Sequence, residues 1–230
     1  MFINSTKLLD IWPSLSASPI LTHFSWSPLI VAALVANAHI IHPALSSANL
    51  SSFMPSSKPA PLTGLVALHV RRGDFIEHCP HLTKWSVPYS SFNDFPGFPD
   101  KLSLPDVKNQ GDAPPEEMAR YAAHCFPDIK QVVSRVREVR ESLLPTTKLT
   151  RLYVLSNGRP EWISELKDAL QEDARREGMG EWEHIGASRD LLLTSEQKHN
   201  SQAVDMAVAQ RAEVFIGNGV CFTFFFIRWS

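Results

Sequence analysis

Two kinds of hydrophobic pattern alternate along the second half of the chain. Short apolar runs occur at 65–70, 151–156 and 213–217, and each ends in polar or glycine residues. Between these runs, apolar residues recur every three or four positions, which is the spacing of amphipathic helices. Short apolar strands that alternate with helices indicate a parallel sheet covered by helices. We therefore predict an α/β fold with a parallel, Rossmann-like sheet and flanking helices.

The predicted helices share an apolar stripe and a recognisable start. Pro114 and Pro115 precede two glutamates, which favour a helix start because acidic side chains lie near the positive end of the helix dipole. A second helix opens near Asp128, and we expect its charged residues between Lys130 and Glu141, Arg140 among them, to form a solvated face. Further helices are expected at 29–41, 161–177 and 202–211, with a short strand at 183–185.

Two regions do not fit this alternation. Residues 1–60 show no clear hydrophobic period apart from the predicted helix at 29–41, and they end in a connector rich in Ser and Pro. Residues 80–115 form a long segment whose aromatic residues favour an insertion folded over the mouth of the first strand, with a mobile surface loop as the alternative. We therefore divide the chain into an N-terminal helical or irregular segment, 1–60, and an α/β domain, 61–230, that carries the insertion 80–115.

Composition and charge narrow the class of partner. The chain has 230 residues, is 44% hydrophobic and carries a net charge of −2. This is ordinary globular composition, and the lack of a broad basic field argues against a nucleic-acid partner. The best apolar run, 28–43, is too short to cross a bilayer and contains Asn37, so we expect no membrane span. The sequence also shows no signal peptide.

The number and spacing of the cysteines, and the absence of common nucleotide-binding motifs, argue against several kinds of site. Three cysteines are too few for a disulfide framework, although an oxidising lumen would allow one bridge, Cys79 to Cys125, with Cys221 left over. The histidines beside Cys79 and Cys125 lack zinc-site spacing, so we expect no metal and either one disulfide or two buried thiols. The sequence contains no P-loop and no Gly-x-Gly-x-x-Gly, which leaves hydride transfer and NTP hydrolysis without support.

A cationic turn follows the first predicted strand. The apolar run ends at Val70 and is followed directly by Arg71-Arg72-Gly73-Asp74. Open α/β sheets bind their ligands outside the carboxyl ends of the strands. Two guanidiniums at such a place suit a diphosphate, and a surface ion pair between arginine and aspartate is the alternative. We expect the ends of the three apolar runs, at 69–71, 156–157 and 217–218, to lie on one rim of the sheet.

Three segments together are similar to a known family. Residues 69–75, which read His-Val-Arg-Arg-Gly-Asp-Phe, the strand 152–156 and the segment 205–218 resemble the C-terminal half of the GDP-fucose protein O-fucosyltransferase family, most closely its fungal members. The resemblance implies the nucleotide-sugar-binding lobe of a GT-B glycosyltransferase. It also implies transfer of fucose from GDP-fucose to a hydroxyl of a protein or glycan acceptor, with inversion, without metal or other cofactor, in the lumen of the ER or Golgi.

The resemblance also assigns roles to individual residues. Arg71 corresponds to the catalytic arginine that stabilises the leaving diphosphate, a role that needs fixed donors where no divalent cation is present. His69 corresponds to a position beside the nucleotide, and Asp205 to an acidic residue near the guanine; a core histidine and a helix-stabilising acid are the alternatives. The expected nucleotide-sugar-binding residues are His69, Arg71, Arg72, Asp205, Gly217 and Asn218.

The chain departs from the family pattern near both ends. Cys221 and Phe222 stand where hydroxyl donors to the phosphates are expected, and the remaining tail is strongly apolar. The N-terminal lobe of the family is expected to be absent or reduced to 1–60, which predicts a truncated chain whose status as an enzyme is open. Two alternatives therefore remain, a catalytically inactive GDP-sugar-binding lobe and a non-enzymatic interaction module built on 80–115.

Overall fold

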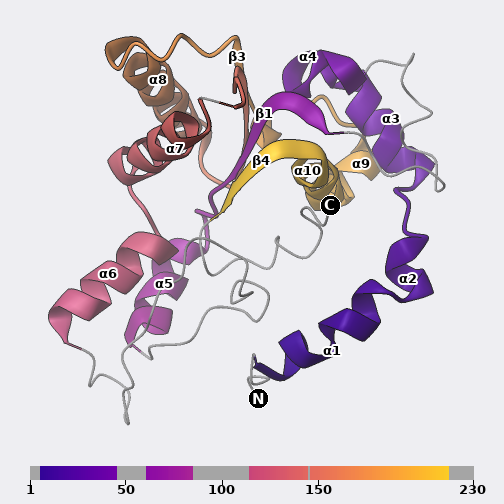
Figure 1. Ribbon diagram of the computed structural model, residues 1–230, viewed down its shortest axis with the longest axis horizontal. Helices are drawn as coiled ribbons and strands as arrows, with labels where there is room; N and C mark the ends of the chain where they lie inside the picture. The colour runs from indigo at the N-terminus through magenta and orange to yellow at the C-terminus, as the bar shows by residue number, and fades with distance from the viewer. Residues whose placement is uncertain (1–5, 46–60, 85–113, 145, 218–230) are drawn as a thin grey trace.

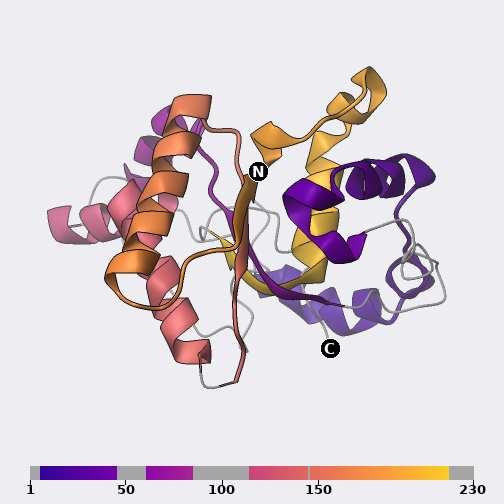
Figure 2. The same cartoon turned by 90° about the horizontal axis from the view of Figure 1, so that it is seen from above.

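The computed structural model describes residues 6–45, 61–84, 114–144 and 146–217, and within them a single sheet organises the fold. Its four strands are all parallel, in the order β3-β2-β1-β4, with helices on both faces (Figures 1 and 2). The predicted α/β fold with a parallel, Rossmann-like sheet is therefore confirmed. The strands are β1 Leu62–His69, β2 Arg151–Leu155, β3 His184–Ala187 and β4 Ala212–Gly217.

Two hydrophobic cores lie on opposite faces of the sheet. Alternate side chains of β1 enter different cores, because successive residues of a strand point to opposite faces. Val66 and Leu68 pack on the face covered by helices α7 and α8, whereas Leu65 and Ala67 pack under α3, α4 and α10 (Figure 2). The helices are α1 Thr6–Ser16, α2 Pro19–Thr22, α3 Pro28–Ala36, α4 Ala38–Ile41, α5 Phe75–Lys84, α6 Pro115–Cys125, α7 Ile129–Leu143, α8 Pro160–Arg176, α9 Ser195–His199 and α10 Ser201–Arg211.

The predicted starts of the helices are largely confirmed. Helix α6 begins at Pro115 and α8 at Pro160, where the fixed φ of proline suits the first helical position. Helix α7 follows a capping box in which the Asp128 carboxylate accepts from the backbone N–H of Gln131 and the Gln131 amide oxygen accepts from the N–H of Asp128, both at 2.8 Å. Local sequence alone therefore determines where these helices begin.

The predicted helix 29–41 is broken in two at Asn37. The Asn37 side chain is buried and donates to the carbonyl oxygens of Ala33 at 2.8 Å and Leu192 at 3.1 Å. It also accepts from the backbone N–H of Leu192 at 2.7 Å. This amide ties α3 and α4 to the connection that follows β3. Residues 28–45 therefore form part of the layer that covers one face of the sheet.

The predicted irregular segment 80–115 begins later than expected. Residues 80–84 complete α5 even though Pro80 removes a backbone donor inside the helix. A disulfide between Cys79 and Cys125 joins α5 to α6, and Phe75 and Tyr121 pack around it. This packing offsets the cost of the proline. Residues 85–113 lie outside the described part of the chain, so an insertion over the first strand stays a prediction.

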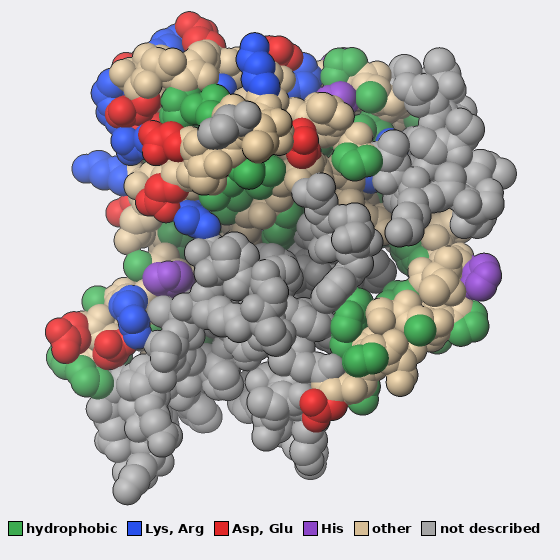
Figure 3. Space-filling view, in the orientation of Figure 1, with side chains coloured by type: hydrophobic (Ala, Val, Ile, Leu, Met, Phe, Trp, Pro, Cys, Tyr) green, Lys and Arg blue, Asp and Glu red, His purple; other side chains and the backbone are tan. Residues whose placement is uncertain are grey.

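The charged surface of α7 and α8 fits the predicted solvated face with one exception. Acidic and basic side chains lie intermixed over these helices (Figure 3), and pairs such as Arg135–Glu138 are exposed. Arg140, in contrast, is only 3% exposed. The prediction was wrong for this residue because Arg140 lies four positions after Val136 and thus falls on the buried stripe. In the described ranges, no helix combines the length and hydropathy that a membrane span requires.

Candidate functional site

The carboxyl ends of the strands form an edge of the sheet at which the connections diverge. From β1 the chain proceeds to β2 and β3 on one side, whereas α10 leads back to β4 on the other side of β1. Open α/β sheets bind ligands at such a topological switch point, here between β1 and β4. His69 at the end of β1 pairs in register with Leu155 of β2 and Gly217 of β4. The three predicted strand ends are therefore neighbours, although Asn218 lies outside the described residues.

Arg71 extends from this edge in an ion pair with Asp74. Its Nε donates to Asp74 Oδ1 at 3.2 Å and its Nη2 to Oδ2 at 2.8 Å. Its guanidinium lies 4.7 Å from the ring centroid of Phe75. The Arg71 side chain is 39% exposed and that of Asp74 53% exposed, so the pair itself contributes little stability. The hydrogen bonds from Arg71 nevertheless lower the pKa of Asp74, which keeps both partners charged.

Arg72 packs against two aromatic rings. Its guanidinium lies 3.6 Å from the ring centroid of Phe126 and 4.5 Å from that of Trp162. It also donates to the carbonyl oxygen of Pro127 at 2.8 Å. Burial lowers the pKa of Arg72, and the nearby Asp128 opposes this effect. The two rings hold the faces of the guanidinium, and one of its donors is used by Pro127, so a diphosphate contact from Arg72 stays a prediction.

Replacement of Arg72 by methionine is expected to cost about 2 kcal/mol of unfolding free energy. The change removes two cation–π contacts and one hydrogen bond that joins the β1 turn to the start of α7. Chemical denaturation of Arg72→Met beside wild type measures this loss. The exposed Arg175→Met is the control, and equal losses in the two variants would contradict a structural role for Arg72.

Asn157 connects the turn after β1 to the turn after β2. Its Oδ1 accepts from the backbone N–H of Arg72 at 2.8 Å, and its Nδ2 donates to Asp74 Oδ1 at 3.1 Å. Gly73 has φ +28°, and a Cβ on it would lie 2.7 Å from Asn157 Nδ2. A side chain at Gly73 would therefore displace Asn157. The sequence marked Asn157 as a strand end, but the bridging contacts depend on the pairing of the strands.

A third arginine, which the sequence analysis did not single out, reaches the same edge. Arg189 is exposed, and it donates from Nε to the carbonyl oxygen of Gly158 at 3.2 Å and from Nη2 to that of Asn157 at 3.1 Å. Ser156 donates to the carbonyl oxygen of Val70 at 2.6 Å and accepts from the N–H of Gly158 at 3.1 Å. These contacts fix the turn after β2 and add a guanidinium beside it.

Asp205 on α10 is held by two hydroxyl groups. Tyr153 of β2 donates to Asp205 Oδ1 at 2.9 Å, and the Ser188 hydroxyl lies 2.9 and 2.8 Å from the two carboxylate oxygens. The Ser188 oxygen in turn lies 3.2 Å from the backbone nitrogen of Ser156. Burial raises the pKa of Asp205 to about 6, against the opposing effects of both hydroxyls and of His69. Asp205 thus braces α10 against β2.

The raised pKa of Asp205 predicts a loss of stability between about pH 4 and pH 6. In the unfolded chain the carboxyl titrates near 3.9, so in this window the folded state binds a proton that the unfolded state has lost. Raising the pH therefore favours unfolding until the folded group ionises. When the pH rises from 4 to 7, wild type should lose on the order of 2 kcal/mol more unfolding free energy than Asp205→Asn does. Denaturant titrations at the two pH values measure both losses. Equal losses would contradict the assignment.

Metal ligands are not gathered at this edge or elsewhere in the described ranges. Within 6–45, 61–84, 114–144 and 146–217, no three His, Cys, Asp or Glu side chains are grouped so that they could hold a metal ion. Cys79 and Cys125 are joined, so the bridge that the sequence allowed is formed. The expectation of metal-independent chemistry stays a prediction.

The comparisons with known proteins do not assign this chain to a family. Neither the models of known protein families nor the curated protein sequences give a match to this chain. The parallel sheet and the geometry of its carboxyl edge are therefore the findings on which a functional proposal can be built.

Proposed function

We propose that this chain is the nucleotide-sugar-binding lobe of a metal-independent, inverting glycosyltransferase that transfers fucose from GDP-fucose to a hydroxyl-bearing acceptor. The observation that carries the proposal is the position of Arg71 directly after β1, at the switch point between β1 and β4. This is where open α/β sheets bind nucleotides. This geometry supports an anionic ligand, whereas the fucose and the guanine rest on the resemblance of residues 69–75 and 205–218 to the O-fucosyltransferases.

Arg71 would act on the leaving group. In the reaction the acceptor oxygen bonds to the anomeric carbon, the bond from that carbon to the diphosphate oxygen breaks, and its electron pair remains on GDP. The acceptor proton passes to a base. A planar guanidinium can stabilise the negative charge that develops on the diphosphate by donating two parallel hydrogen bonds to it. Asp74 already engages the Arg71 fork in this bidentate manner and would be replaced by the diphosphate.

Asp205 retains acceptor capacity for a purine base. Tyr153 and Ser188 each have one hydroxyl proton, so together they occupy two of about four lone-pair sites on the carboxylate. The remaining sites can accept the two N–H groups on one edge of guanine. The hydroxyl contacts would then orient the carboxylate for the base rather than compete with it.

The test is an assay of GDP-fucose turnover by the full chain in the presence of EDTA. Fucosyl transfer to a hydroxyl acceptor or hydrolysis of GDP-fucose, unchanged by EDTA and lost in Arg71→Ala, is the expected result. Saturable binding of GDP-fucose without turnover would instead favour the catalytically inactive lobe. If GDP-fucose does not bind, both versions of the proposal are wrong, and an interaction module remains.

A further inference from the structure

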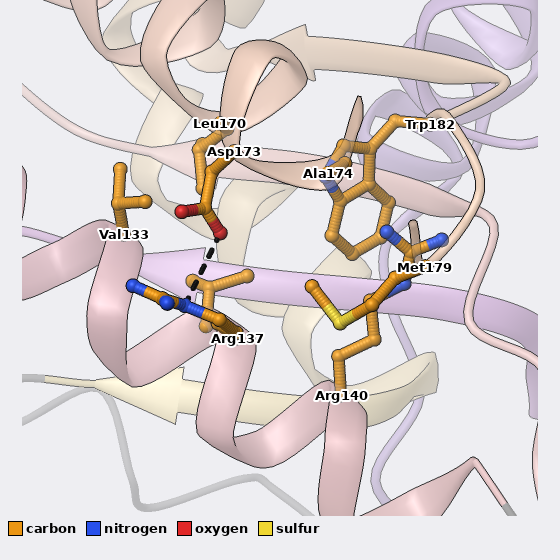
Figure 4. A pocket seen from close by; sticks show the side chains of 9 residues that line it. Val133, Arg137, Arg140, Leu170, Asp173, Ala174, Met179 and Trp182 are labelled. Atoms are coloured by element: carbon orange, nitrogen blue, oxygen red, sulfur yellow. Dashed lines mark ion pairs between the residues drawn. The ribbon is translucent and has the colours of Figure 1, made fainter. Parts of the chain in front are cut away.

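A second cationic site lies away from the carboxyl edge of the sheet. Helices α7 and α8 and the segment before β3 line a small cavity of about 10 Å³ that is partly open to solvent (Figure 4). Its polar lining comes from Arg137 and Arg140 on α7 and from Asp173 on α8, and its apolar lining includes Leu170, Met179 and Trp182. None of these residues belongs to the proposed nucleotide-sugar site.

Arg140 is a buried cation, and two of its three guanidinium nitrogens have no hydrogen-bond acceptor in the described part of the chain. The residue is 3% exposed, and its guanidinium lies 4.1 Å from the ring centroid of Trp182 (Figure 4). Within the described part of the chain, its buried Nε and Nη1 have no hydrogen-bond acceptor. The cost of burying an uncompensated charge exceeds what a desolvated cation–π contact contributes. The guanidinium therefore needs an anionic partner.

The carboxylate that lines the cavity is engaged by other arginines. Asp173 lies 2.7 Å from Arg176 Nη2 through its Oδ1 and 3.4 Å from Arg137 Nε through its Oδ2. Figure 4 shows the Arg137–Asp173 pair on the other side of the cavity from the Arg140 guanidinium, which lies by Trp182. Two guanidiniums and one carboxylate line the cavity, so its lining carries an excess positive charge.

The size of the cavity limits what can neutralise this charge. A volume of about 10 Å³ has room for about one small particle, so a monatomic anion suits it better than a polyatomic anion such as phosphate. Water would accept the hydrogen bonds but would leave the buried charge uncompensated. We propose that the cavity is a halide site, in which a chloride ion is bound by Nε and Nη1 of Arg140. The apolar walls strengthen the attraction because they lower the local dielectric constant, and the bound ion stabilises the packing of α7 on α8.

Bromide replaces chloride and can be located, so it is the probe for this site. Thermal unfolding of the full chain is measured at constant ionic strength while sodium bromide replaces sodium gluconate. A saturable rise in Tm is expected for wild type and for the exposed control Arg175→Met, because an ion that binds only the folded state stabilises it. In Arg140→Met the apparent bromide affinity should fall at least about tenfold.

A crystal soaked in bromide provides a readout that does not depend on a variant. An anomalous peak within hydrogen-bond distance of Arg140 Nε and Nη1 is the expected result. An ordered water in that position with no anomalous signal would overturn the proposal, as would equal bromide responses of wild type and Arg140→Met. If Arg140→Met does not fold, the soaked wild-type crystal alone decides between the two occupants.

Discussion

Replacement of Arg71 by alanine is expected to lower the affinity for GDP and GDP-fucose at least about 30-fold. Removing one partner of a hydrogen-bonded charge pair costs about 2–5 kcal/mol, and each 1.4 kcal/mol is about a tenfold change in affinity. The affinity of Arg71→Lys should lie between those of wild type and Arg71→Ala, because an ammonium keeps the charge but cannot form two parallel hydrogen bonds to a diphosphate. The measurement is the GDP-dependent rise in Tm of wild type and both variants.

The Arg71 substitutions should hardly change the unfolding free energy of the unliganded protein. The ion pair between Arg71 and Asp74 is exposed, and such pairs contribute about 0–1 kcal/mol. Arg175→Ala, which removes an exposed guanidinium of α8, is the matched control and should bind GDP as wild type does. If Arg71→Ala and Arg175→Ala respond equally to GDP, Arg71 does not bind the diphosphate.

Loss of the bridge between Cys79 and Cys125 is expected to cost about 4 kcal/mol of unfolding free energy. The bridge closes a loop with a sequence separation of 46, and the chain-entropy relation assigns about that value to a loop of this length. Denaturant unfolding of Cys79→Ser measures the loss. Cys221→Ser is the control, since it makes the same replacement but leaves the bridge intact.

The same bridge should also affect the proposed nucleotide site. It joins α5 to α6, and these helices support the two aromatic rings that pack against the arginines, Phe75 beside Arg71 and Phe126 beside Arg72. We expect reduced protein to bind GDP more weakly than oxidised protein. Equal unfolding curves for oxidised and reduced protein would contradict the structural role of the bridge.

The sheet was predictable because a parallel strand buried on both faces leaves a strong local signal. The apolar runs at 65–70, 151–156 and 213–217 coincide with β1, β2 and β4 to within a few residues. Strand β1 begins earlier than predicted because Gly64, which reads as a turn, lies inside it at φ +80°. Its backbone N–H donates to the Glu213 side chain of β4. A contact between residues so distant in sequence leaves no local pattern.

The edge of the sheet was predictable, but the contacts made there were not. Parallel strands bring their carboxyl ends together, so the proximity of residues 69, 155 and 217 follows from the alternation of strands and helices. Arg72, in contrast, is enclosed by Phe126 and Trp162, which come from other connections. Its partners depend on how the helices dock. An arginine in a sequence motif therefore predicts a charge at the edge, but not the direction of its side chain.

The buried polar groups illustrate the same distinction. Asp205 was expected to lie near guanine, which stays a prediction, but its contacts with the hydroxyls of Tyr153 and Ser188 were not expected. A tyrosine within a buried strand needs a hydrogen-bond partner, and this need was the signal in the sequence. Arg140 was assigned to the solvated face because the helix as a whole is highly charged. Counting positions from Val136 would have placed it on the apolar stripe.

The most direct test of the central claim compares GDP with guanosine by calorimetric titration into the full chain in the presence of EDTA. Arg71 at the switch point between β1 and β4 is proposed to bind the diphosphate without a metal ion. The account predicts saturable binding of GDP that EDTA does not change, and binding of guanosine that is at least about 30-fold weaker. Equal affinities for GDP and guanosine, or loss of GDP binding in EDTA, would contradict it.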